Sequence, residues 1–206
     1  MIKINYFDLG LHKDAFEVDM FISICEKNRI DYTVWGFEAH PEYCDNLTKK
    51  YVGNNKVNII NKAISNKDCQ IDLYIADSND GEGNSIFKSK NNVNKNKVVK
   101  VDGILFSNWL KENVENFEIS NNILRFNIEG AEWHLMNDLD EKDMLKDFKI
   151  FLGSTPDMQK VSELKGYVNE YMKILKKNNI IIKRFTKVNH GNNCNLLNII
   201  NKKIKS

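Results

Sequence analysis

Short runs rich in apolar residues alternate along this chain with runs of helical periodicity, and this alternation constrains the fold more than any other feature. The first pair is a strand over Ile2–Leu9 and then a helix in which Val18, Phe21, Ile22 and Cys25 recur at helical spacing. Alternating strands and helices form a mostly parallel sheet with helices on both faces. The 206 residues suffice for one such core, and no linker divides them, so we expect a single domain over residues 1–206.

The same pattern predicts the other elements. Further strands are expected over Tyr32–Phe37, Val57–Ile64, Ile71–Ala76, Val98–Val101, Ile123–Ile128 and Phe148–Leu152. Helices are expected from Pro41, which suits a first turn, and over Ile104–Lys111, Ala131–Leu139 and Gln159–Lys177. The last apolar runs, Ile180–Phe185 and Leu196–Ile200, are expected to close the sheet as an antiparallel pair. The polar stretch 77–96, rich in Gly and Asn, is expected to be a long loop of the kind that often covers a binding site.

Composition excludes several classes of function. The 30 basic and 28 acidic residues are interspersed, so no concentrated basic face favours nucleic acid as a partner. No run approaches the roughly 18 apolar residues of a membrane-spanning helix. The cysteines (Cys25, Cys44, Cys69, Cys194) form no CxxC pair and have no metal-ligand spacing. They favour a reducing compartment, and we expect the protein in the cytoplasm.

The residues that follow each strand carry the functional information, because open parallel sheets bind ligands beyond the carboxyl ends of their strands. Gly10 follows the first strand, and a glycine there lets the backbone approach a ligand closely. Glu38 ends the second strand, where a carboxylate can accept hydrogen bonds from both hydroxyls of a ribose. Taken alone, Gly10 is explained by a simple turn and Glu38 by a solvated side chain. The occurrence of both, in this order after the first two strands, favours a nucleoside ligand.

The strand over Ile123–Ile128 ends in polar residues that are costly to bury without partners. Asn127 and Glu129 alternate there with the apolar Phe126 and Ile128, and Gly130 then opens a helix. A binding site explains these polar groups better than core packing does.

Together these segments resemble one family. The motif FDLG near the start, GFEAHPEYCDNL, NKAIS (Asn61–Ser65) and NIEGAEWHLM are similar to the FkbM-type S-adenosylmethionine-dependent methyltransferases over roughly Tyr6–Leu139. The resemblance implies an α/β, Rossmann-like class I methyltransferase fold. Its sheet would be mostly parallel and seven-stranded, with helices on both faces and an antiparallel C-terminal hairpin. It also implies that S-adenosyl-L-methionine donates a methyl group to a hydroxyl of a sugar or glycan and leaves as S-adenosyl-L-homocysteine.

The resemblance further implies roles for individual residues. The methionine part of the cofactor would lie against Asp8, Gly10, Leu11 and His12. Glu38, beside Ala39, would hold the ribose, and Lys62, Ala63 and Ile64 would lie near the adenine. Asn127 and Glu129 would lie near the reactive methyl group and the acceptor. The chain departs from the family pattern at Asp14, where a second glycine is usual, and at Arg125 and Asn127, which replace a Lys-x-Asp pair.

A sugar hydroxyl is a weak nucleophile, so a general base or a metal ion should activate it. Asparagine cannot act as a base, which makes Glu129 the first candidate and Asp157, just past the strand Phe148–Leu152, the second. A divalent cation held by these two carboxylates stays open as an alternative, although no spacing requires one. Ser78, Ser85 and His134 are further candidates for contacts with the acceptor.

Two other functions compete with methyl transfer. A nicotinamide-dependent oxidoreductase would share the fold, but Gly10 lacks the following glycines of a GxGxxG motif. A catalytically inactive cofactor-binding domain is the other alternative, and the departures at Asp14 and Asn127 favour it.

Overall fold

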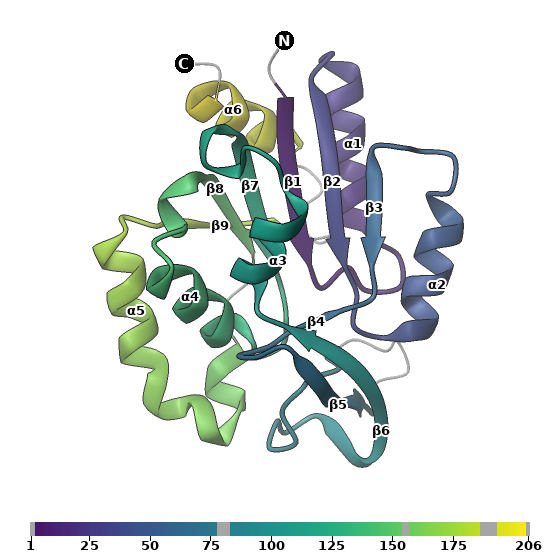
Figure 1. Ribbon diagram of the computed structural model, residues 1–206, viewed down its shortest axis with the longest axis vertical. Helices are drawn as coiled ribbons and strands as arrows, with labels where there is room; N and C mark the ends of the chain where they lie inside the picture. Colours follow the sequence, from purple (N-terminus) through teal and green to yellow (C-terminus); the bar gives the residue numbers. More distant parts are fainter. Residues whose placement is uncertain (1–2, 78–82, 154–156, 186–192, 205–206) are drawn as a thin grey trace.

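A six-stranded parallel sheet forms the centre of the protein, as seen in a computed structural model that describes residues 3–77, 83–153, 157–185 and 193–204 (Figure 1). The strands are β1 (Lys3–Leu9), β2 (Asp31–Phe37), β3 (Val57–Ile60), β7 (Asn121–Phe126), β8 (Phe148–Gly153) and β9 (Ile182–Arg184). They lie in the order β3-β2-β1-β7-β8-β9, and all neighbours run parallel. The chain therefore reverses its direction of travel across the sheet between β1 and β7, which is where such sheets bind ligands.

Helices cover both faces of this sheet because side chains alternate along each buried strand. Ile4 and Tyr6 of β1 pack with α1 (Phe16–Lys27), α2 (Pro41–Lys50) and α6 (Asn193–Ile204). Phe7 and Leu9 face the opposite way and pack with α3 (Phe106–Asn113), α4 (Glu132–Glu141) and α5 (Val168–Lys177). The expectation of an α/β fold with a mostly parallel sheet between two helical layers is confirmed.

A second, smaller sheet lies at the carboxyl ends of the central strands (Figure 1). It contains β4 (Ala63–Ile64), β5 (Cys69–Ala76) and β6 (Val93–Ile104), with β6 in the middle and β5 antiparallel to it. Short 3-10 helices complete the structure: η1 (Phe117–Ile119), η2 (Leu145–Asp147), η3 (Asp157–Lys160) and η4 (Ser162–Tyr167). The small sheet thus stands over the edge at which ligand binding is expected.

The predicted run Ile180–Phe185 contains the strand β9, but the prediction of an antiparallel C-terminal pair was wrong. Leu196–Ile200 belongs to the helix α6, in which Leu196 and Ile200, four residues apart, are both buried against the central sheet. β9 pairs with β8 in parallel. The described residues therefore form six central strands rather than seven and contain no antiparallel C-terminal hairpin.

Three other boundaries differ from expectation. The run Val57–Ile64 divides at Asn61 into β3 and β4, which belong to different sheets. The long loop ends earlier than expected, because β6 already begins at Val93 and pairs with β5. The α-helix expected from Gln159 begins only at Val168, after the turns of η3 and η4. Within the described part of the chain, no helix has the length and apolar character needed to cross a bilayer.

Candidate functional site

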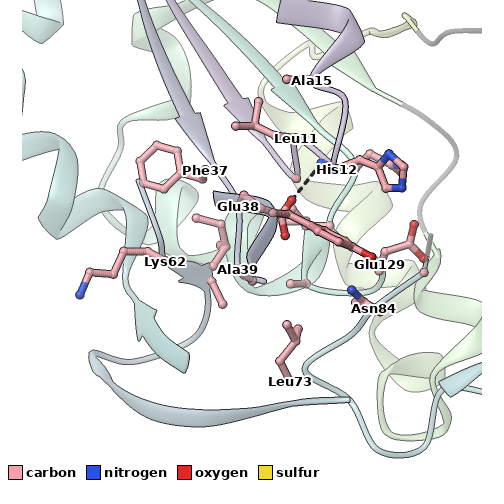
Figure 2. Close-up of a pocket in the computed structure, with 18 of the residues that line it drawn as sticks. Leu11, His12, Ala15, Phe37, Glu38, Ala39, Lys62, Leu73, Asn84 and Glu129 are labelled. Carbon is pink, nitrogen blue, oxygen red and sulfur yellow. Dashed lines mark hydrogen bonds between the residues drawn. The ribbon is translucent and has the colours of Figure 1, made fainter. Parts of the chain in front are cut away.

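A cavity of about 290 Å³ opens between the carboxyl ends of β1, β2 and β7 and the small sheet. Its central-sheet wall consists of the turns after those strands, around Gly10, Glu38 and Asn127. Its opposite wall comes from β4, from Leu73 of β5 and from residues near Asn84. Figure 2 shows the Glu38 carboxylate among the residues that line this cavity, with Leu73 and Asn84 on the far side. The three segments singled out in the sequence therefore meet at one site.

The turn after β1 requires glycine. Gly10 has φ +91°, and a Cβ atom at this position would lie only 2.2 Å from the carbonyl oxygen of Asn127. The amides of Gly10 and Leu11 both donate to the carbonyl of Phe37, at 3.0 and 3.1 Å. The backbone therefore passes tightly between the ends of β2 and β7, as the lack of a side chain allows.

Glu38 is the buried carboxylate at the centre of the cavity wall. Its oxygens accept hydrogen bonds from the amides of His12 at 2.9 Å and His40 at 2.8 Å, and the residue is only 7% exposed (Figure 2). Burial raises the pKa of Glu38 to about 7, although these amides oppose the shift. The Ala39 amide also bonds to this carboxylate. A carboxylate offers roughly four acceptor positions, so about one remains for a hydroxyl group of a ligand.

Asp8 does not line the cavity but supports the turn that does. The register pairs Asp8 of β1 with Arg125 of β7, and Arg125 Nη1 donates to Asp8 Oδ1 at 2.7 Å. The same nitrogen donates to the carbonyl of Gly10 at 2.7 Å, and Arg125 Nη2 lies 3.5 Å from Glu17. Burial raises the pKa of Asp8 to about 6, with Arg125 opposing the shift. Arg125, which the sequence marks only as a departure from the family pattern, thus fixes the turn at Gly10.

The turn after β7 holds Glu129 in a conformation unusual for a residue with a side chain. Glu129 has φ +57° and Gly130 φ +113°, and such a left-handed conformation costs a non-glycine residue about 1–2 kcal/mol. The Glu132 carboxylate compensates by accepting from the amides of Ile128 at 3.1 Å and Gly130 at 2.8 Å. The hydroxyl of Ser85 donates to the carbonyl of Glu129 at 2.8 Å. Backbone strain of this kind is typical of functional sites.

A buried lysine connects the two candidate catalytic carboxylates. Lys90 Nζ forms an ion pair with Glu129 Oε2 and lies 3.6 Å from Asp157 Oδ2. The Lys90 side chain is 0% exposed, and its ammonium also donates to the carbonyl of Gly83 at 3.1 Å. Lys90 is not among the residues predicted for the site, because nothing in the polar stretch around it distinguishes this lysine from Lys88 nearby.

The remaining predicted residues lie in different places. Ala39, Lys62, Ala63 and Ile64 all line the cavity. The ammonium of Lys62 points away from Glu38 (Figure 2) and pairs with Asp102 at 2.8 Å. Ser85 is buried under the turn at Glu129 rather than in the cavity lining. His134 does not line the cavity and packs against Phe87, with ring centroids 5.3 Å apart. Ser78 lies outside the described residues.

Acidic groups predominate around the cavity. Its lining includes four carboxylate side chains, Asp14, Glu17, Glu38 and Glu129, and two basic ones, Lys62 and Arg125. Both basic groups are paired with carboxylates behind or beside the cavity, Lys62 with Asp102 and Arg125 with Asp8. Two of the four carboxylates also have a cation beside them, Glu17 next to Arg125 and Glu129 next to Lys90. Among the residues described, no group of three or more His, Cys, Asp or Glu side chains is arranged to hold a metal ion. The lining therefore suits a ligand with positive charge better than one with several negative charges.

Comparison with protein-family models, curated proteins and solved structures gave no match to this chain. The geometry and charge of the cavity therefore carry the functional inference.

Proposed function

We propose that this protein is an S-adenosyl-L-methionine-dependent methyltransferase that acts on a hydroxyl of a sugar or glycan. The observation that carries the proposal is the buried Glu38 carboxylate, which stands in a cavity at the point where the strand order reverses. Carboxylates at this place in Rossmann-like sheets bind ribose hydroxyls. The sequence resemblance to FkbM-type methyltransferases supports the same assignment.

The lining suits the separate parts of this cofactor. Apolar Phe37, Ile64 and Leu73 provide a surface for the adenine ring near Glu38. The turn from Gly10 to His12 would receive the methionine part. S-Adenosylmethionine carries a sulfonium and an ammonium against one carboxylate, so its net charge is positive and suits the acidic lining.

The charge of the lining also separates this cofactor from a nicotinamide dinucleotide. The two phosphates of a dinucleotide need backbone amides or cations at the start of the first helix. Here Asp14 and Glu17 flank the start of α1, and Arg125 is engaged by Asp8. These acidic groups disfavour the oxidoreductase alternative.

In the proposed reaction the acceptor oxygen attacks the methyl carbon in line with the departing sulfur, so much of the rate comes from positioning. A C–O bond forms while the C–S bond breaks, and the sulfur keeps the bonding electron pair as a neutral thioether. The hydroxyl proton passes to the carboxylate of Glu129, which lines the cavity and is partly exposed to it. Burial raises the pKa of Glu129, with Lys90 opposing the shift, which brings it closer to the range useful to a general base.

Calorimetry with S-adenosylmethionine tests the cofactor assignment. Wild-type protein should bind in the micromolar range, and Glu38→Ala should weaken binding sharply because the ribose loses its acceptor. Glu112→Ala, on the exposed surface of α3, is the matched control and should bind as the wild type does. Equal affinities for wild type and Glu38→Ala would remove Glu38 from the site, and a larger thermal shift with NAD than with S-adenosylhomocysteine would favour the oxidoreductase.

Transfer of radiolabelled methyl groups to a panel of sugars and glycans tests the reaction. Glu129→Gln should keep cofactor affinity and lose turnover, because an amide cannot accept the hydroxyl proton. Undiminished turnover would exclude Glu129 as the base and direct attention to Asp157. Cofactor binding without transfer to any acceptor would favour an inactive cofactor-binding domain.

A further inference from the structure

We propose that Lys90 is a positioning residue, whose buried ammonium holds Glu129 and Asp157 together and keeps Glu129 directed and ionised as the proton acceptor. The catalytic role of Lys90 rests on the proposed function, whereas the cluster of Lys90, Glu129 and Asp157 follows from the distances in the structure. Lys90 lies on a segment from the small sheet, Asp157 on η3 and Glu129 after β7, so three separate elements meet at this ammonium.

The surroundings of Lys90 match the bonding capacity of an ammonium group. An ammonium has three N–H donors, and Nζ has oxygens of Glu129, Gly83 and Asp157 around it, the last at ion-pair distance. A fully buried lysine without such partners would lose its charge. The arrangement therefore holds the positive charge of Lys90 inside the protein, next to Oε2 of Glu129.

This charge matters because two carboxylates lie side by side. Burial raises the pKa of Glu129, and neighbouring Asp157 raises it further, while Lys90 lowers it. Burial also acts to raise the pKa of Asp157, but Lys160, Glu129 and Lys90 outweigh it and bring that pKa below its usual value. Glu132 and Lys160 also interact electrostatically with Glu129, and Lys160 forms an ion pair with Asp157 at 2.9 Å. Lys90 is the ammonium in direct contact with the Glu129 carboxylate, and it favours the ionisation of Glu129 beside a second carboxylate.

Lys90 also connects the base to the wall of the cavity. Gly83, Asn84 and Ile86 of the same segment line the cavity opposite Glu38. The segment is fastened at its other side, where the amide of Ser162 donates to the hydroxyl of Ser89 at 3.1 Å and Ser89 bonds to Glu163. Lys90 therefore holds Glu129 in a fixed position relative to the cavity wall formed by Gly83, Asn84 and Ile86.

Carboxyl-carbon NMR titration of protein labelled with ¹³C in Asp and Glu tests the inference without any ligand. Glu129→Gln identifies the Glu129 signal. Replacing the ammonium by an apolar side chain in Lys90→Met should raise the titration midpoint of Glu129 by at least about one pH unit, a tenfold change in its acid dissociation constant. Lys146→Met, which removes an exposed lysine paired with Asp143, is the matched control and should leave the midpoint unchanged.

A second variant protects the test against misfolding of Lys90→Met. Asp157→Asn removes the neighbouring negative charge and should lower the midpoint of Glu129, opposite to the effect of Lys90→Met. An unmoved midpoint in folded Lys90→Met overturns the role of Lys90, and an unmoved midpoint in Asp157→Asn overturns the coupling of the two carboxylates on which that role depends. Calorimetry with S-adenosylmethionine separates the proposed function from the electrostatic role of Lys90. If the wild-type protein does not bind the cofactor while the midpoints move as stated, the proposed function fails and the role of Lys90 in the carboxylate pair stands.

Discussion

The ionisation of Glu38 should control cofactor affinity across the neutral pH range. Ribose hydroxyls donate hydrogen bonds, so the ionised carboxylate binds them better than the protonated form. Because burial raises the pKa of Glu38 to about 7, the ionised fraction grows as pH rises through neutrality. Affinity for S-adenosylhomocysteine should therefore increase from acidic to alkaline pH, opposite to the behaviour expected of a ligand held by a histidine cation.

The size of the effect follows from the titration. With a pKa of about 7, about 3% of Glu38 is ionised 1.5 pH units below this value and about 97% at 1.5 units above it. If only the ionised form binds, the dissociation constant changes about 30-fold between these limits, equivalent to about 2 kcal/mol. The backbone amides of His12 and His40 stay in place, so the change reports the carboxylate itself.

Isothermal calorimetry with S-adenosylhomocysteine over this pH range measures the effect. Glu38→Gln is the matched control, because it keeps the size of the side chain but does not titrate, and its affinity should be low and nearly independent of pH. An equal pH dependence in both proteins would assign the effect to another group and refute the reasoning about Glu38.

Three predictions concern the turns around the cavity. Glu132→Gln should flatten the pH dependence of the free energy of unfolding measured in urea. Burial raises the pKa of Glu132 to about 7, so the protonated carboxyl adds up to about 3 kcal/mol of stability below pH 4.5, and this contribution is lost as pH rises through 7. Gly10→Ala should cost at least about 2 kcal/mol and abolish cofactor binding, because its Cβ would meet Asn127; wild-type affinity would contradict this. Arg125→Met should lower stability by about 3–5 kcal/mol by leaving Asp8 buried without its partner; an unchanged melting temperature would exclude that role.

The central strands could be predicted because each is a short apolar run that ends in polar or glycine residues. Gly10, Glu38 and Glu129 were placed together correctly from the rule that parallel strands direct their carboxyl ends to one edge. Asp157 and Glu129 were separate candidates in the sequence, and the structure brings them near the same lysine because β8 lies beside β7. These predictions depend only on local pattern and strand direction.

The errors arose where long-range contacts decide the outcome. Leu196–Ile200 is a short apolar run whose spacing fits a strand or a helix, and packing against the central sheet selects the helix. Lys90 is buried only because the segments around Gly83, Glu129 and Asp157 meet there. The local sequence does not indicate such long-range contacts, so the burial of Lys90 could not be predicted from the polar stretch that contains it.

The division of the cavity between two sheets has a consequence for the diversification of such proteins. Turns of the central sheet hold Glu38 and Gly10, whereas the facing wall around Asn84 and Ile86 belongs to the connection between β5 and β6. Under the proposed function, exchange of that connection for one of different shape, with Lys90 retained, would alter which acceptors fit and leave in place the turns proposed to hold the cofactor. The acceptor specificity of such a protein could then change while its methyl donor stays the same.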